Sequence, residues 1–234
     1  NFFALSENRR RIKKKKIPKV FNSDSSKKII KNLPFNLTQS QIEVYNEINV
    51  DLLSDNRMFR IIQGDVGSGK TIVSLLSIIN VIKSGYQCAL MSPTEILAKQ
   101  HYELSKKIFK NNIKIEFLTG KTEYKFRKGI LNNLKNGKID LLIGTHALFQ
   151  KKIDFKKLGL VVIDEQHKFG VRQRSDLAQK GGSNCDVLLM SATPIPRTMM
   201  MSLYGDMDIS KINEKPAERK KIITLSKPEK KMNE

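Results

Sequence analysis

The chain has 234 residues, 39% of them hydrophobic and 28% charged, and a formal net charge of +20. No apolar run reaches the roughly 18 residues of a membrane-spanning helix, and two cysteines cannot build a disulfide scaffold or a CxxC-type zinc site. The chain begins with increasingly basic residues, unlike a secretory signal. These features disfavour membrane-spanning, secreted and zinc-finger classes, and we expect a cytoplasmic protein.

Positive charge gathers at both ends of the chain. Residues 1–32 carry 11 Lys and Arg against 2 Asp and Glu, and residues 211–234 carry 8 against 4. This balance favours a nucleic-acid partner, although a merely solvated lysine-rich surface would look the same. We expect a basic linker over 1–32, a compact domain over 33–210 and the start of a second linker over 211–234, in a piece of a longer protein.

Helical and strand patterns alternate along the compact part. Thr38 and Gln41 form a capping-box pattern at the start of the first helix. The short apolar runs are typical of strands buried on both faces of a parallel sheet. The alternation predicts a doubly wound α/β domain with helices on both faces. The expected helices span about 38–52, 70–84, 94–110 and 122–136, and the expected strands 58–63, 86–91, 113–118, 139–143, 160–163 and 187–190.

A glycine-rich segment follows the first expected strand and opens the next helix. It fits the phosphate-binding pattern GxxxxGK[ST], in which glycines and a helix N-terminus present N–H groups to phosphate oxygens. We expect Lys70 to be exposed and catalytic, reaching the β- and γ-phosphates, and Thr71 to ligate Mg²⁺. A glycine-rich turn without a ligand is the alternative. The residues expected to bind ATP here are Gly64, Asp65, Val66, Gly67, Ser68, Gly69, Lys70 and Thr71.

An acidic pair, Asp164 and Glu165, follows the expected strand 160–163. Ligand sites of open α/β sheets lie at the carboxyl ends of the strands. Asp164 is expected to hold Mg²⁺, and Glu165 is expected to be catalytic by polarising the attacking water. Such a pair is commonly a solvated turn, but the phosphate-binding segment upstream favours the functional interpretation. ATP and Mg²⁺ are therefore the expected cofactors.

Two residues upstream complete the expected nucleotide site. Phe35 and Gln41 flank Thr38. A glutamine amide offers both a donor and an acceptor, so Gln41 can read an adenine edge. Gln41 equally fits a purely structural capping box, and both roles can hold.

Several segments together resemble the RecG family of bacterial ATP-dependent DNA helicases, within superfamily 2. Residues 164–167 read Asp-Glu-Gln-His, a DEAH/DEQH-type box, and residues 191–193 read Ser-Ala-Thr. The transcription-repair coupling factor shares part of this pattern, whereas the segments 94–97, 146–148, 164–167 and 204–208 favour RecG. The segments that carry the resemblance are 33–41, 63–71, 92–98, 144–148, 164–174 and 191–198.

The resemblance implies a RecA-like first motor lobe, in a helicase that uses ATP to remodel forks and Holliday junctions. Branched double-stranded DNA would be its partner. The protein would act as a monomer and would not associate with a membrane. The resemblance also implies that the second lobe and the DNA-splitting wedge are missing from this chain, apart from a remnant of the wedge within 1–32. The rival readings are another superfamily 2 motor and a nucleic-acid-binding module with a non-hydrolysing nucleotide site.

The resemblance also assigns residues to DNA binding and to coupling. Small and hydroxylated groups at the ends of strands suit contacts with phosphates. Without the family resemblance, each of these segments would be interpreted as an ordinary loop or helix cap. The residues implied in DNA binding are Pro93, Thr94, Thr119, Gly120, Lys121, Gly144, Thr145 and His146. Those implied in coupling the ATP site to the DNA site are His167, Ser191 and Thr193.

Overall fold

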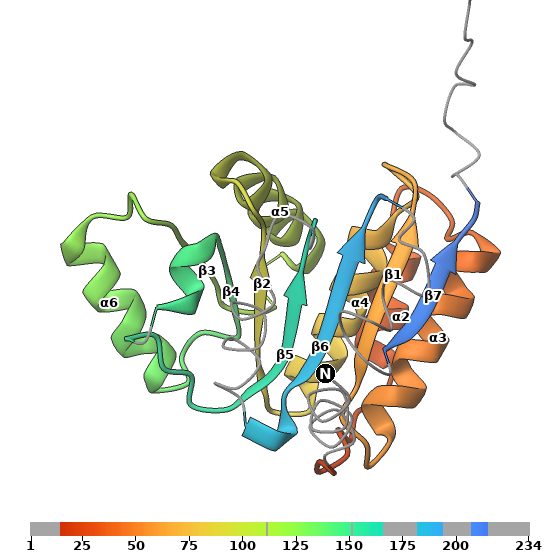
Figure 1. Cartoon of the computed structure of the whole chain (residues 1–234), viewed down its shortest axis with the longest axis horizontal. Helices are drawn as coiled ribbons and strands as arrows, with labels where there is room; N and C mark the ends of the chain where they lie inside the picture. The colour runs from red at the N-terminus through yellow and green to blue at the C-terminus, as the bar shows by residue number, and fades with distance from the viewer. Residues whose placement is uncertain (1–14, 111, 151, 166–181, 194–206, 215–234) are drawn as a thin grey trace, which may run out of the picture.

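A seven-stranded parallel sheet organises the computed structural model of the chain, which describes residues 15–110, 112–150, 152–165, 182–193 and 207–214. The strands lie in the order β3-β4-β2-β5-β6-β1-β7, with their carboxyl ends at one edge, the upper edge in Figure 1. This confirms the predicted parallel α/β architecture. The strands are β1 (Phe59–Gly64), β2 (Gln87–Met91), β3 (Ile115–Leu118), β4 (Leu141–Gly144), β5 (Leu158–Ile163), β6 (Asp186–Ser191) and β7 (Asp208–Ile212).

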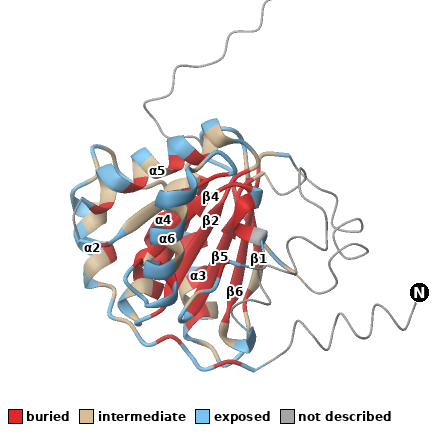
Figure 2. Ribbon diagram, turned by 90° about the vertical axis from the view of Figure 1, so that its left-hand side faces the viewer, coloured by how far each residue is buried: buried red, intermediate tan, exposed pale blue. Residues whose placement is uncertain are grey.

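Helices cover both faces of the sheet in the described part of the chain. One core lies between the sheet and the helices α3, α4 and α5, and a second lies between the opposite face, α6 and the short helix η1. The strands form the buried layer between them, drawn red in Figure 2. The helices are α2 (Asp24–Lys31), α3 (Gln39–Leu53), α4 (Lys70–Lys83), α5 (Glu95–Phe109) and α6 (Tyr124–Lys135), with 3₁₀ helices η1 (His146–Phe149) and η3 (Gly182–Asn184).

The apolar runs in the sequence fold as strands because side chains alternate between these two cores. In β1, Ile62 faces the first core and Ile61 the second, and both are fully buried. In β2, Leu90 likewise faces the first core and Met91 the second. A strand whose two faces are both covered needs apolar residues at consecutive positions. The central strands therefore read as unbroken apolar runs.

The segment 20–32, expected as linker, instead contains α2, so that expectation is wrong. Asp24 lies in its first turn and Lys28 and Lys31 in its last, charges that suit the helix dipole. Its buried Ser26 Oγ accepts a hydrogen bond from Tyr45 Oη of α3 at 2.7 Å. The linker interpretation followed the Ser and Lys content, whereas packing against α3 and α4 decides the structure.

The beginning and the end of the compact domain also differ from the expected bounds. Lys16 and Lys19 have fully buried side chains, both paired with Asp186 at the start of β6. At the other end, β7 continues past the expected boundary at residue 210 and pairs with β1. β7 was missed because its alternation of exposed and buried residues is short.

Both cysteines, Cys88 and Cys185, are buried and free. Burial raises the pKa of the Cys185 thiol to about 12. None of the helices that the structure describes combines the length and apolar character required to cross a bilayer.

Candidate functional site at the carboxyl edge of the sheet

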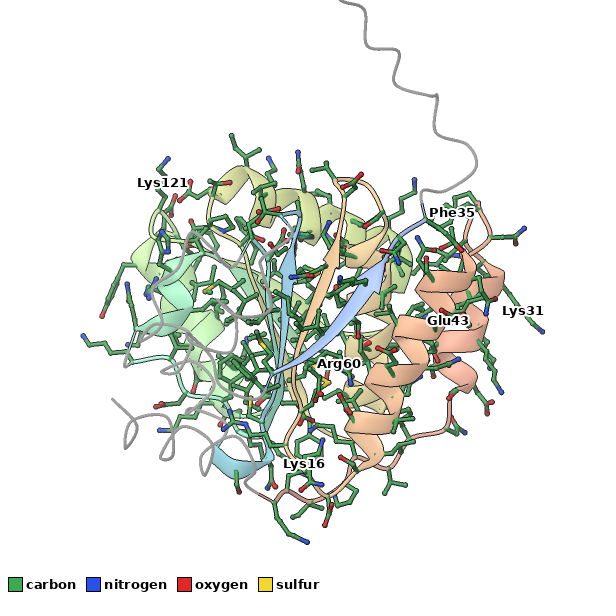
Figure 3. The ribbon with its side chains drawn as sticks, turned by 45° about the vertical axis from the view of Figure 1, so that its right-hand side comes forward. Lys16, Lys31, Phe35, Glu43, Arg60 and Lys121 are labelled. Atoms are coloured by element: carbon green, nitrogen blue, oxygen red, sulfur yellow. The ribbon has the colours of Figure 1, made fainter. Side chains whose placement is uncertain are left out.

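The candidate residues fall into two neighbouring groups along the carboxyl edge. The glycine-rich segment, the acidic pair and Ser191 follow β1, β5 and β6, which are adjacent strands. The segments expected to bind DNA follow β2, β4 and β3, the next three strands along the same edge. In Figure 3, Phe35 and Lys121 lie toward this edge and Lys16 lies at the opposite one. The strand order therefore places the segments expected to bind the nucleotide beside the segments expected to bind DNA.

The glycine-rich loop, residues 64–71, has the backbone that its glycines predict. Gly67 and Gly69 have φ angles of 77° and 88°, in the left-handed region that favours glycine. A Cβ atom on Gly69 would lie 2.2 Å from Nε2 of Gln41, so a side chain cannot be accommodated there without displacing Gln41. Tight packing against α3 and the left-handed backbone together require glycine at this position.

Lys70 is 8% exposed, so the expectation of an exposed lysine is wrong. Its Nζ donates hydrogen bonds to the carbonyl oxygens of Gly64 at 2.6 Å and Asp65 at 2.9 Å. Burial lowers the pKa of the ammonium group below its ordinary value, and the nearby carboxylates of Asp164 and Glu165 partly counter this shift. The lysine thus lies folded into the loop, with its charge close to the acidic pair.

Gln41 connects the start of α3 to this loop. Its Oε1 accepts a hydrogen bond from the N–H of Thr38 at 3.0 Å, which confirms the capping box. Its Nε2 donates to the carbonyl oxygen of Ser68 at 2.8 Å, and the side chain is 1% exposed. The structural role of Gln41 is therefore confirmed, and both of its amide groups are engaged. Recognition of adenine by Gln41 and the half-buried Phe35 stays a prediction.

Asp164 and Glu165 lie where β5 ends. The Asp164 carboxylate accepts a hydrogen bond from the N–H of Glu165 at 2.9 Å and lies 2.7 Å from Nε2 of His101. Glu165 has a φ of 47°, an unusual value for a residue other than glycine and one often found at functional sites. Sequence reasoning missed His101. The signal was the stripe of buried residues Ala98, His101, Ser105 and Phe109 along α5.

The residues present fit a nucleotide and its metal. The Ser68 Oγ is buried without a hydrogen-bond partner, so the loop holds a donor suited to a phosphate oxygen. A cavity of about 260 Å³ adjoins the loop, lined in part by Gly64, Asp65, Ser68 and the segment 211–214. The hydroxyl of Thr71 and the carboxylate of Asp164 are oxygen ligands of the kind that Mg²⁺ prefers.

The Ser-Ala-Thr segment forms a local turn at the end of β6. The Thr193 N–H donates to the Ser191 Oγ at 3.3 Å, and the two hydroxyls lie 3.1 Å apart. Ser191 is buried, whereas Thr193 is exposed. The third residue expected in coupling, His167, lies outside the described residues.

The segments expected to bind DNA are built from short-range contacts. The Thr94 hydroxyl accepts from the N–H of Leu97 at 3.3 Å and caps α5. The Thr119 hydroxyl accepts from the N–H of Lys121 at 3.2 Å. Lys121 has an exposed side chain whose Nζ lies 3.2 Å from a Glu95 oxygen, which links the loops after β2 and β3. The cap and turn roles are therefore real, and DNA binding stays a prediction.

The remaining DNA candidates lie at or just after the carboxyl ends of β2, β3 and β4. A Cβ atom on Gly144 would lie 2.0 Å from the carbonyl oxygen of Leu118, so the two strands approach too closely for a side chain. Thr145 is buried, whereas His146 and Gly120 are exposed. Pro93 is half-buried after β2.

Comparison with known proteins identifies the family. The model of the DEAD/DEAH box helicases matches residues 38–202. The chain belongs to this family. It is 51% identical over 225 residues to the ATP-dependent DNA helicase RecG of Aquifex aeolicus, and 48% identical over 219 residues to that of Thermotoga maritima. These matches cover 94% and 93% of this chain but 28% of each RecG helicase.

Solved helicase structures share the fold. A structure of RecG bound to a three-way DNA junction superimposes with a TM-score of 0.82 and 43% identity, over 93% of this chain and 29% of that one. A DEAD box protein of Methanococcus jannaschii has a TM-score of 0.61 and 20% identity, over 81% of this chain and 53% of that protein, which supports the fold alone. The expected resemblance to RecG and the RecA-like helicase fold are confirmed, and the coupling factor is not favoured.

Proposed function

We propose that this helicase chain is the ATP-binding motor lobe of a RecG-type enzyme that acts with Mg²⁺ on branched double-stranded DNA. The observation that carries the proposal is the juxtaposition of the glycine-rich loop and the Asp164–Glu165 pair at one sheet edge, together with the buried, unpartnered hydroxyl of Ser68 within that loop. The RecG structure with a three-way junction supports branched DNA as the partner. We also propose that the protein is monomeric and cytoplasmic.

Each nucleotide-site residue has a role in this proposal. The loop amides, Ser68 and Lys70 bind phosphate oxygens, and Lys70 leaves its two carbonyl partners to do so. Thr71 and Asp164 hold Mg²⁺, which supplies positive charge against the phosphates. Glu165 orients the attacking water and accepts its proton. Gln41 and Phe35 contact the adenine, and Ser191, Thr193 and His167 couple the nucleotide site to the DNA site.

Steady-state phosphate release by the 234-residue chain tests the ATP-hydrolysis role. We expect slow hydrolysis that forked DNA barely stimulates, and hardly any difference between the parent and Glu165→Gln. In this proposal the residues named above would contact one side of the γ-phosphate, and an arginine finger from another lobe is worth about 10³ to 10⁵ in rate. Adding a second helicase lobe should raise turnover and make it depend on Glu165.

The outcomes separate the candidate functions. Turnover of about 10 s⁻¹ by the chain alone, with strong stimulation by forked DNA, would refute the one-lobe interpretation. A chain that stays inactive with the second lobe present, while still binding DNA, would instead favour a nucleic-acid-binding module with a non-hydrolysing site.

The DNA role predicts salt-sensitive binding that is independent of DNA sequence. Each phosphate neutralised contributes about −0.9 to the slope of log K against log salt. Neutralising Arg9, Arg10 and Arg11 together, or Lys121 alone, should flatten the slope by up to about that amount per residue. Lys83→Ala is the control, because Lys83 is exposed at the end of α4 remote from the carboxyl edge.

Deletion of the whole segment 1–32 is unsuitable for this test, because Lys16, Lys19 and α2 are part of the fold. Point substitutions at Arg9, Arg10 and Arg11 leave Lys16, Lys19 and α2 in place. An unchanged slope in the arginine variant would show that the basic start is merely solvated.

A further inference from the structure

Helix α5 carries a buried histidine to which the proposed function gives no role. His101 is 8% exposed, and its Nε2 lies 2.7 Å from Oδ2 of Asp164, which is 9% exposed. A carboxylate only accepts hydrogen bonds, so the imidazole N–H is the donor. The pair is therefore a buried contact between α5 and the acid proposed to hold Mg²⁺.

The Asp164 side chain is held at both of its oxygens. Oδ1 accepts from the N–H of Glu165 and Oδ2 from His101. The backbone N–H of Asp164 in turn donates to the carbonyl oxygen of Met91 at 2.8 Å. A carboxylate has about four lone-pair positions, so these two contacts fix its orientation and leave lone pairs available to a cation.

The same helix begins at the loop expected to bind DNA. Met91 ends β2, the loop with Pro93 follows, and Thr94 caps α5. His101 lies six residues beyond the first residue of the helix, about 9 Å along its axis. Met91 and His101 therefore hold Asp164 from the two ends of one continuous segment. A helix is a rigid element, so a shift at its start is carried to His101.

We propose that His101 is a positioning residue for Asp164, and that through α5 it links contacts at the Pro93–Thr94 loop to the metal-binding acid. The inference rests on the proposed ATP and Mg²⁺ site. Without the imidazole, Oδ2 loses its buried donor and the carboxylate is free to rotate about its χ angles. Partners that orient a metal ligand typically change metal affinity by about 10- to 100-fold when removed.

The test compares ATP affinity in Mg²⁺ with ATP affinity in EDTA, by calorimetry on the whole chain. The ratio of the two is the Mg²⁺ enhancement. His101→Leu should reduce this enhancement by about 10- to 100-fold and leave the affinity in EDTA unchanged. His101→Gln should restore most of it, because the Gln amide carries an N–H donor near the position of Nε2. Ser105→Ala is the matched control, since Ser105 Oγ donates to the His101 carbonyl oxygen at 2.7 Å.

Each outcome either supports or overturns the positioning role of His101. An enhancement in His101→Leu equal to the parent's would overturn it, as would an equal loss in Ser105→Ala, which removes a buried α5 hydrogen bond without changing the imidazole. If thermal melting shows that His101→Leu does not fold, His101→Gln and the shorter His101→Asn replace it. The Asn amide ends one carbon closer to the backbone than the Gln amide, so it should not reach Asp164. Equal Mg²⁺ enhancement in these two variants would therefore overturn the positioning role.

Failure of the underlying site gives a different result. If the parent binds ATP no better than Lys70→Ala, the proposed function fails and the positioning role fails with it. If the parent binds in a Lys70-dependent manner but the His101 variants keep its Mg²⁺ enhancement, only the positioning role fails.

A second arm tests the link to DNA. Addition of a DNA duplex should change the Mg²⁺ enhancement of the parent and of His101→Gln, but leave that of His101→Leu unchanged. An identical response to DNA in all three proteins, or no response in the parent, would overturn the coupling through α5.

Discussion

Lys70→Ala should weaken Mg-ATP binding by at least about 100-fold while the chain remains folded. A charge-assisted hydrogen bond contributes about 1.5–3 kcal/mol, and Lys70 is expected to make at least one with the phosphates. Since 1.4 kcal/mol is about tenfold in affinity, one such bond accounts for most of the loss. Calorimetric titration of ATP in Mg²⁺ is the measurement. Lys83→Ala, at the exposed end of the same helix, should bind ATP like the parent.

The fold should survive because burial opposes the charge of Lys70. Its pKa is lowered in the folded chain, chiefly by desolvation, so the unfolded chain holds this proton more tightly. Between the lowered pKa and the ordinary value near 10.5, the contribution of Lys70 to the free energy of unfolding therefore rises with pH. At neutral pH the group carries a cost that alanine removes. Undiminished ATP affinity in a folded Lys70→Ala would disprove the assignment of the loop.

Asp186→Asn should lower the free energy of unfolding by about 3–5 kcal/mol. The Asp186 carboxylate accepts from Lys16 Nζ at 2.8 Å at both oxygens, from Lys19 Nζ, and from the N–H of Met58 at 2.7 Å. All three ionic side chains are fully buried. An asparagine would remove the negative charge that both ammonium groups contact and turn an amide donor toward one of them. Urea denaturation measures the loss.

The magnitude is large because folded domains have only about 5–15 kcal/mol of stability. The matched control is Asp55→Asn, which removes a carboxylate paired with the neighbouring Lys15 at the exposed surface, at 2.8 Å. Solvent screening should make that change immeasurable. The combined replacement Lys16→Met, Lys19→Met and Asp186→Leu should recover most of the lost stability, because no buried charge then remains in this cluster. If Asp186→Asn proves as mild as Asp55→Asn, the buried cluster does not anchor the start of the chain.

Sequence alone determined the features that depend on neighbouring residues. The glycine spacing of 64–71, the capping box at Thr38 and the apolar run before Asp164 are each contained within one element and its adjoining turn. Such patterns report backbone geometry and the burial of both strand faces directly. They predicted the parallel sheet, and they predicted the phosphate-binding loop and acidic pair as parts of one site.

Only the tertiary structure decided the contacts between residues remote in sequence. The distances in sequence are 63 residues for His101 and Asp164 and 170 for Lys16 and Asp186. These pairs depend on the strand order, which brings β5, β6 and β1 together, and on the packing of α5, from which His101 reaches the residue that follows β5. The burial of Lys70 and the helix at Asp24–Lys31 have the same origin, since packing against other elements overrides a local pattern of charged and polar residues.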